Sequence, residues 1–501
     1  MNSLKKYIFY SLILTLILFQ SATHGFGSKT IQIGPNPQND LSHEEAHKNF
    51  PHIRPDQTGF ILYDLSNNRV VAAHNRNQLF IPASTTKILT VAASLHLLGP
   101  EHQFKTILSR SGSIHQGVLK GNLYLTGGGD PDLGINDLLQ MIREMKQKGI
   151  RKVDGKFIFD NSRYEESHEI DEIMDDEAAY NTGISALSLG TNNLIAFWKK
   201  SSYRGPTNFF LIPSLSMNEV RNKKYKKKEN IESEYIGENN REIWMLSPRN
   251  ANSGLKFLPV KNPSLFTAQV FKKLSEIEGI SLPQPEKGRT PWHSFSIHQV
   301  KSRTVLEISR TILATSNNTM TENLLLSLAA ERGIQTPNLD SASSYLTEFL
   351  RGLPGDTDWN GFSIQNGSGL TSENRISPEQ LLAGVLFSSQ ISDDEFNFEE
   401  LLPVSGWSSI LRTRLNDPET AFRIHAKNGG IFYAMSLAGY LYADSGKKYA
   451  FAFMISDYDS RLAYEKTNNK KDRKVRSKIF SWRKLNQDFM DETLKMWIKK
   501  F

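Results

Sequence analysis

The sequence predicts a mixed α/β (α+β) fold in which a mainly-β region interrupts a larger domain. Near the start, residues 59–64 and 69–73 have the pattern of an antiparallel hairpin, and residues 84–98 have helical spacing. Near the end, residues 434–442 and 449–455 form a second hairpin pattern around a turn that contains glycine. Between these ends, residues 104–260 consist mostly of short β-like runs separated by turns.

Helical patterns return after the β-rich region. They cover residues 264–279, 304–314, 320–331 and 377–388, and a last amphipathic stretch covers 487–499. We expect the terminal helix to cover the sheet formed by the closing strands.

Length and composition indicate a globular protein of two or more domains. The 501 residues exceed what one ordinary hydrophobic core holds. Hydrophobic residues make up 39% and charged residues 23%, which excludes a mainly disordered chain and a multi-spanning membrane protein.

The N-terminus has the pattern of an export signal. Lys5 and Lys6 precede an apolar run over residues 7–19, which is short for a membrane span but suits the core of a signal peptide. We expect residues 1–25 to be cleaved and residues 26–50 to form a leader. An uncleaved N-terminal anchor with the same topology is the alternative.

The absence of cysteine excludes thiol nucleophiles, disulfides, thiolate metal sites and a lipoprotein anchor. The formal charge of +7 and the pI near 9.1 suit an anionic partner. For an exported protein this is the cell-wall polymer or a peripheral membrane contact, and not nucleic acid. The basic run at residues 221–228 is either a solvated loop or a contact for the wall polymer or lipid headgroups.

Ser84 and Lys87 begin the first predicted helix with a spacing of three. This spacing places the hydroxyl and the ammonium on one face, one turn apart. A serine hydroxyl needs a base to become a nucleophile, and a buried lysine with a lowered pKa can be that base. Alone, the pair equally fits a helix-capping serine beside a solvated lysine.

Two further short motifs follow in order along the chain. Residues 316–318 read Ser-Asn-Asn between two helical patterns, and residues 427–429 read Lys-Asn-Gly at the closing hairpin. Together with residues 84–87 they resemble the Ser-x-x-Lys, Ser-x-Asn and Lys-Thr-Gly motifs of the penicillin-binding and serine β-lactamase superfamily. The resemblance implies that superfamily's transpeptidase-like fold.

Longer stretches narrow the resemblance to the class C low-molecular-mass penicillin-binding proteins, which are D-alanyl-D-alanine carboxypeptidases and endopeptidases. These stretches are residues 127–133, 160–164, 366–370 and 436–440. The long gap between the first two motifs also fits, because this branch carries an insertion there. We therefore expect a discontinuous catalytic domain over residues 51–102 and 261–501, with an inserted domain region over 103–260.

The resemblance implies a role for each motif residue. Ser84 would be the acylated nucleophile and Lys87 its general base. Ser316 and Asn318 would relay a proton to the leaving group and hold the substrate amide. At the third motif, Lys427 would bind the substrate carboxylate and help keep Lys87 neutral. Asn428 takes the place of a threonine hydroxyl that contacts this carboxylate, and Gly429 and Gly430 would let the substrate backbone lie along the strand edge.

The sequence departs from the family pattern at three positions. Asn428 stands where threonine is usual, Asn366 replaces an aspartate, and Ser372 stands where an arginine is expected. Arg375 is close enough in sequence to supply the missing cation. The departures leave open a catalytically weak or inactive peptidoglycan-binding scaffold.

The resemblance also suggests a binding residue in the insertion. Asp160 matches an aspartate that binds the free amino group of a diamino-acid side chain in the family, although a turn-forming aspartate after a strand is an equal reading. A serine β-lactamase is the other alternative, but no Glu-x-x-Leu-Asn sequence provides a class A deacylation base.

The predicted protein is thus a periplasmic serine hydrolase of peptidoglycan. β-Lactam antibiotics would be covalent inhibitors, and the reaction needs no metal or organic cofactor. The oligomeric state stays open.

Overall fold

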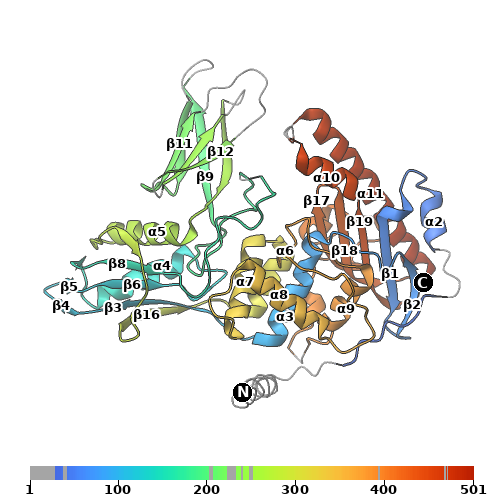
Figure 1. Ribbon diagram of the computed structural model, residues 1–501, viewed down its shortest axis with the longest axis horizontal. Helices are drawn as coiled ribbons and strands as arrows, with labels where there is room; N and C mark the ends of the chain where they lie inside the picture. Colours follow the sequence, from blue (N-terminus) through green and yellow to red (C-terminus); the bar gives the residue numbers. More distant parts are fainter. Residues whose placement is uncertain are drawn as a thin grey trace, which may run out of the picture.

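The computed structural model describes residues 29–37, 42–175, 177–201, 207–222, 233–238, 241–247, 252–392, 395–467, 470 and 472–501 (Figure 1). The predicted signal peptide, residues 1–25, lies outside the described residues, as do residues 223–228 of the basic run. Across the described ranges, no helix combines the length and the apolar character that crossing a bilayer requires.

One antiparallel sheet joins the two ends of the chain. Its order is β17-β18-β19-β1-β2. The strands are β1 (Thr58–Asp64), β2 (Arg69–His74), β17 (Ile424–Ile431), β18 (Ala434–Tyr442) and β19 (Lys448–Ser456). β1 pairs with β19 along its whole length, so the predicted opening and closing hairpins form a single sheet.

Alternating side chains give this sheet two buried faces. Ile61 and Tyr63 belong to a core shared with helices α3 and α9, whereas Phe60 and Leu62 belong to a core shared with α11. Helices α6, α7 and α8 pack around α3. The helices are α2 (Ser42–Lys48), α3 (Thr86–Leu98), α6 (Val305–Thr315), α7 (Asn318–Glu331), α8 (Leu339–Arg351), α9 (Pro378–Ser388), α10 (Tyr458–Lys466) and α11 (Arg473–Lys500).

A second five-stranded sheet, in the order β15-β8-β6-β3-β16, forms the base of the insertion. Its strands are β3 (Lys105–Arg110), β6 (Leu123–Thr126), β8 (Phe157–Asp160), β15 (Pro285–Lys287) and β16 (Phe295–Lys301). Two helices pack on it, α4 (Ile135–Gln147) and α5 (Pro263–Ile277), and a small sheet joins β4 (Ser113–His115), β5 (Val118–Lys120) and β7 (Lys152–Val153).

The strand pairing of the insertion favours a later end than the predicted residue 260. Strands β15 and β16 pair with β8 and β3, and α5 shares the buried core of this sheet. A boundary at residue 260 would divide one packed unit. We therefore propose that the insertion ends near residue 302, between β16 and α6.

Two further three-stranded sheets of the insertion project from its five-stranded base and pack together (Figure 1). They contain β9 (Asn193–Lys200), β10 (Thr207–Ile212), β11 (Asn218–Asn222), β12 (Ser233–Glu238), β13 (Arg241–Leu246) and β14 (Ser253–Pro259). Leu194 and Ala196 of one sheet share a buried core with Trp244 and Leu246 of the other. Lys256 of β14 forms an ion pair at 2.8 Å with Glu177, which lies in the segment between β8 and β9.

The C-terminal helix is longer than predicted. Its buried apolar residues Phe489, Met490, Leu494 and Trp497 cover the central sheet, as expected from the pattern over 487–499. The helix begins at Arg473. The sequence pattern did not predict its first turns, because they are mostly polar and exposed and therefore lack the apolar stripe that predicts a packed helix. These first turns extend past the sheet.

Candidate active site

Ser84 lies in a tight turn that leads into α3. The turn is a 3-10 helix over Ala83–Thr85, and Ala83 has a φ of +47°. The Thr85 and Thr86 hydroxyls donate to the carbonyls of Pro82 and Ala83 at 2.7 and 2.9 Å. These bonds hold the half-buried Ser84 at the start of the helix.

Lys87 is fully buried and points at Ser84. Its Nζ donates to Ser84 Oγ at 2.9 Å, to Asn318 Oδ1 at 2.7 Å and to the Ser368 carbonyl at 2.7 Å. Burial, followed by the nearby positive charge of Lys427, holds the pKa of Lys87 well below its usual range. A neutral amine at hydrogen-bond distance from a serine hydroxyl can accept the hydroxyl proton.

Ser316 and Asn318 lie at the junction of α6 and α7. Ser316 ends α6 with a φ of +57°, and Asn317 caps α7 by accepting the N–H of Met320. Asn318 accepts from Lys87 and donates to the Tyr180 carbonyl at 3.1 Å. Ser316 lines the same pocket as Ser84 and Asn318.

The third motif lies on β17, an edge strand of the central sheet, and consists of Lys427, Asn428 and Gly429. Burial lowers the pKa of Lys427 to about 7, and its Nζ donates to the Asn428 carbonyl at 2.7 Å. A β-carbon on Gly429 would lie 2.8 Å from the backbone nitrogen of Ser84. Glycine at this position therefore allows the strand to approach the serine closely.

The loop at residues 366–370 closes the far side of the lysine. The Ser368 carbonyl accepts from Lys87, and the N–H groups of Gly367 and Ser368 donate to the buried carboxyl of Glu322. Asn366 Oδ1 accepts the N–H of Leu370 at 3.0 Å. An amide oxygen supplies this acceptor as well as a carboxylate would, so the Asn366 departure preserves the turn.

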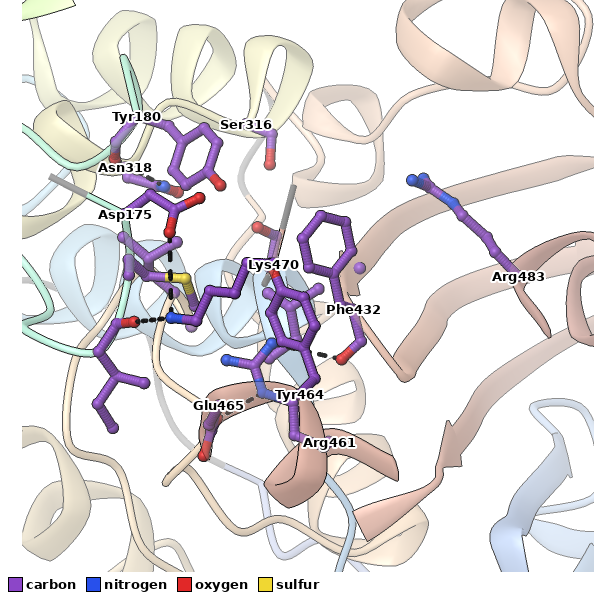
Figure 2. Close-up of a pocket in the computed structure, with 17 residues that line it drawn as sticks. Asp175, Tyr180, Ser316, Asn318, Phe432, Arg461, Tyr464, Glu465, Lys470 and Arg483 are labelled. Atoms are coloured by element: carbon purple, nitrogen blue, oxygen red, sulfur yellow. Dashed lines mark hydrogen bonds and ion pairs between the residues drawn. The ribbon is translucent and has the colours of Figure 1, made fainter. Parts of the chain in front are cut away.

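A pocket of about 370 Å³ opens beside Ser84 (Figure 2). Residues from widely separated parts of the chain meet there, including the Ser84 turn, the α6–α7 junction, the end of β17, α10 and α11 of the larger domain and the 173–175 stretch of the insertion. Its polar and charged side chains are Ser84, Asp175, Tyr180, Ser316, Asn318, Arg461, Tyr464, Glu465, Lys470 and Arg483.

Ser372, which stands where the family has an arginine, lies beside an ion pair that lines this pocket. Ser372 donates to Glu465, which also accepts from Arg461 Nε at 2.6 Å. Arg375 instead donates to the carbonyls of Ser372 and Asn374 and stacks on Tyr458. The expected replacement cation is therefore engaged outside the pocket, and a cation from α10 lines the pocket in its place.

The structure does not bring Asp160 together with Ser84. Asp160 lies at the end of β8, and its two carboxylate oxygens accept the N–H groups of Ser162 at 3.0 Å and Thr290 at 2.7 Å. This arrangement is that of a turn-stabilising aspartate. The insertion contributes Asp175 to the pocket instead, which the sequence reasoning missed because no recognised motif surrounds it.

Comparison with known proteins decides the family. The model of the D-Ala-D-Ala carboxypeptidase 3 (S13) family matches residues 41–477. The chain belongs to this family. The S13 match includes all three predicted motifs, both five-stranded sheets and the insertion. The chain is therefore a class C low-molecular-mass penicillin-binding protein and a serine-type peptidase.

Individual relatives have low sequence identity to this chain, but they align with most of its length. The D-alanyl-D-alanine carboxypeptidase DacB of Haemophilus influenzae is 25% identical over 429 residues, which are 82% of this chain and 87% of the relative. The D-alanyl-D-alanine carboxypeptidase of Actinomadura sp. is 23% identical over 79% of this chain and 77% of its own.

The fold also matches a solved structure. The crystal structure of penicillin binding protein 4 (dacB) from Haemophilus influenzae superposes with a TM-score of 0.76 at 19% identity, covering 91% of this chain and 99% of that one. The predicted penicillin-binding fold is thereby confirmed.

Proposed function

We propose that this protein hydrolyses D-alanyl peptide bonds of peptidoglycan through an acyl-enzyme on Ser84. The reaction removes a terminal D-alanine or opens a D-alanyl cross-link. The observation that carries the assignment is the 2.9 Å contact between Ser84 Oγ and a fully buried Lys87 whose pKa is strongly lowered.

The first half of the reaction forms an ester. Lys87 takes the proton of Ser84 as Oγ attacks the scissile carbonyl carbon, and the backbone N–H groups at the helix start face the resulting oxyanion. The carbon–nitrogen bond then breaks. The proton that Lys87 accepted passes through Ser316 to the departing amine, so that Lys87 is neutral again and Ser316 keeps its hydroxyl proton. The Asn318 side chain, held by Lys87 and Tyr180, binds the substrate amide.

The second half releases the acyl group. Water attacks the Ser84 ester, Lys87 again accepts the proton, and the Ser84 oxygen leaves and regains a proton. The product of this half is a shortened peptide with a new carboxylate, and the Ser84 hydroxyl of the enzyme is regenerated.

Lys427 is proposed to bind the terminal carboxylate of the substrate, with Asn428 beside it. The positive charge is needed for this interaction, and it is lost as the pH rises through the pKa of about 7. The cationic form predominates below that pH and the neutral form above it. We therefore expect kcat/KM for a peptide with a free C-terminal carboxylate to fall above about pH 7.

The pH effect is measured with two peptides that differ only at the C-terminus. The kcat/KM of the carboxylate peptide reports the free enzyme. A C-terminal carboxamide peptide is expected to lack the decline that Lys427 causes. A carboxylate-peptide profile that continues to rise through pH 9 would contradict this role.

Two further proposals concern β-lactams as inhibitors and the periplasm as the location of the protein. β-Lactams present a strained amide that Ser84 would open to give a stable acyl-enzyme, so we propose them as covalent inhibitors. The apolar run at residues 7–19 supports export to the periplasm, where the peptidoglycan substrate lies. A peripheral membrane contact is compatible with the net charge of +7.

The test of the proposed activity is D-alanine release from a purified pentapeptide and cleavage of a cross-linked muropeptide, each followed by mass spectrometry. Loss of one alanine from the pentapeptide or division of the dimer is expected. A folded protein that hydrolyses a penicillin rapidly and leaves both peptides intact would indicate a β-lactamase. A folded protein that binds peptidoglycan and cleaves nothing would indicate a scaffold.

A further inference from the structure

The pocket beside Ser84 continues into a second hollow that the proposed chemistry does not use. This hollow measures about 410 Å³ and is lined by four residues of one loop, by Lys256 of β14 and by the first turns of α11. The loop residues are Asp175, Glu177, Ala178 and Tyr180. The two hollows share the lining residues Asp175, Tyr180, Phe432, Tyr464, Lys470 and Arg483. They therefore form one groove that runs from Ser84 toward Lys256.

Cationic side chains outnumber carboxylates along this groove. Among the described residues, three carboxylates line the groove, and each has a cationic partner. The pairs are Asp175 with Lys470 at 3.9 Å, Glu177 with Lys256 at 2.8 Å, and Glu465 with Arg461 at 2.6 Å. Arg476 and Arg483 also line the groove, and neither forms an ion pair with another described residue. The groove is thus left with positive charge at α11.

Arg483 is the closer of these two arginines to the reacting centre. It is exposed on α11, two turns after Arg476. Its Nη2 lies 3.8 Å from the position that a β-carbon on Gly430 would occupy. Figure 2 shows the guanidinium pointing from α11 toward the pocket. Since Gly430 follows Gly429, Arg483 reaches the strand edge one residue past the closest approach to Ser84.

The direction of the substrate follows from the proposed function, on which this inference rests. With the terminal carboxylate at Lys427 and the scissile carbonyl at Ser84, the retained part of the peptide continues along β17 past Gly430 and Phe432. That path leads into the groove. Groups on the retained part therefore come within reach of Arg483.

We infer that Arg483 determines substrate specificity by binding a free carboxylate on the retained part of the stem peptide. A guanidinium suits this role because its planar array of donors matches a carboxylate in a bidentate geometry. The substrate class is a peptide that carries at least one carboxylate upstream of the scissile bond, in addition to its terminal carboxylate.

The experiment uses two peptides that end in D-Ala-D-Ala. One carries free carboxylates on the retained part, and the other carries carboxamides at those positions. D-Alanine release gives kcat and KM for the full-length mature protein, for Arg483→Gln and for the control Lys484→Gln. Lys484 is the next residue of α11, and it pairs with Asp488 instead of lining the groove.

The wild-type protein is expected to prefer the carboxylate peptide by about tenfold in kcat/KM, mainly through KM, which is the scale of one charge-assisted contact. Arg483→Gln is expected to reduce this preference to near one, and Lys484→Gln to retain it. An unchanged preference in Arg483→Gln, or an equal loss on both peptides, would overturn the inference.

Benzylpenicillin acylation of the same three proteins separates this inference from the proposed function. If the wild-type protein forms no acyl-enzyme and cleaves neither peptide, the proposed function fails and the inference fails with it. If the wild-type protein is acylated and cleaves both peptides with equal kcat/KM, only the inference is overturned.

Discussion

Replacing Lys87 with methionine is expected to slow acylation of Ser84 by about a thousandfold, the scale of a lost general base. Methionine fills the same buried space, but it has no nitrogen to accept the Ser84 proton. The present contacts from Nζ to Ser84, Asn318 and Ser368 would also be lost. The measurement is the second-order rate constant for acylation by a fluorescent penicillin.

Lys87→Arg serves as the companion variant, because arginine carries a positive charge that it does not give up at physiological pH. If Lys87 acts as a base, both variants lose acylation. If it acts only as a fixed cation, the arginine variant retains a substantial rate. Thermal unfolding of both variants checks that the buried site remains folded, and a methionine variant within tenfold of wild type would refute the base assignment.

Gly429→Ala is expected to have the second-largest effect on activity. The added β-carbon would lie 2.3 Å from Ser436 Oγ, 2.6 Å from the Pro82 carbonyl and 2.8 Å from the Ser84 nitrogen. Two of these atoms belong to the backbone of the nucleophile turn, so the strand or the turn has to shift. A displacement of about 1 Å at a reacting group costs about 100-fold in rate.

The same substitution is expected to lower the free energy of unfolding by about 2 kcal/mol, since overpacking a buried site typically costs this much. Gly430→Ala is the stability control in the same strand, because its β-carbon would have no neighbour closer than 3.8 Å. Chemical denaturation measures both. Equal stability and full acylation in Gly429→Ala would show that the turn accommodates the extra atom.

The central sheet and the motif residues were predictable from local sequence. Strands such as 434–442 carry mostly apolar residues on both faces because both faces of the sheet are buried, and the structure gives this strand the same bounds. The three motifs lie together in the structure, since Lys87 contacts Ser84 and Asn318, and Gly429 approaches Ser84. The motifs could be predicted because their residues are closely spaced and the three motifs follow the family's order along the chain.

The remainder of the pocket depends on tertiary contacts that local patterns do not encode. Asp175 lies in an irregular segment, and Arg461, Lys470 and Arg483 come from polar stretches near the C-terminus. Charged residues in such stretches are usually solvated, so nothing local distinguishes a groove cation from a surface cation. The proposed shift of the boundary from residue 260 to about 302 has a related reason, because β15 and β16 pair with strands far earlier in the chain.

The most direct test of the account is covalent labelling of the signal-free protein by a fluorescent penicillin, compared with Ser84→Ala by denaturing gel and intact mass. The account predicts one adduct on the wild-type protein, mapped to Ser84 by peptide mass, and no adduct on the variant. Absence of an adduct on folded wild-type protein, or an adduct of equal yield on Ser84→Ala, would contradict it.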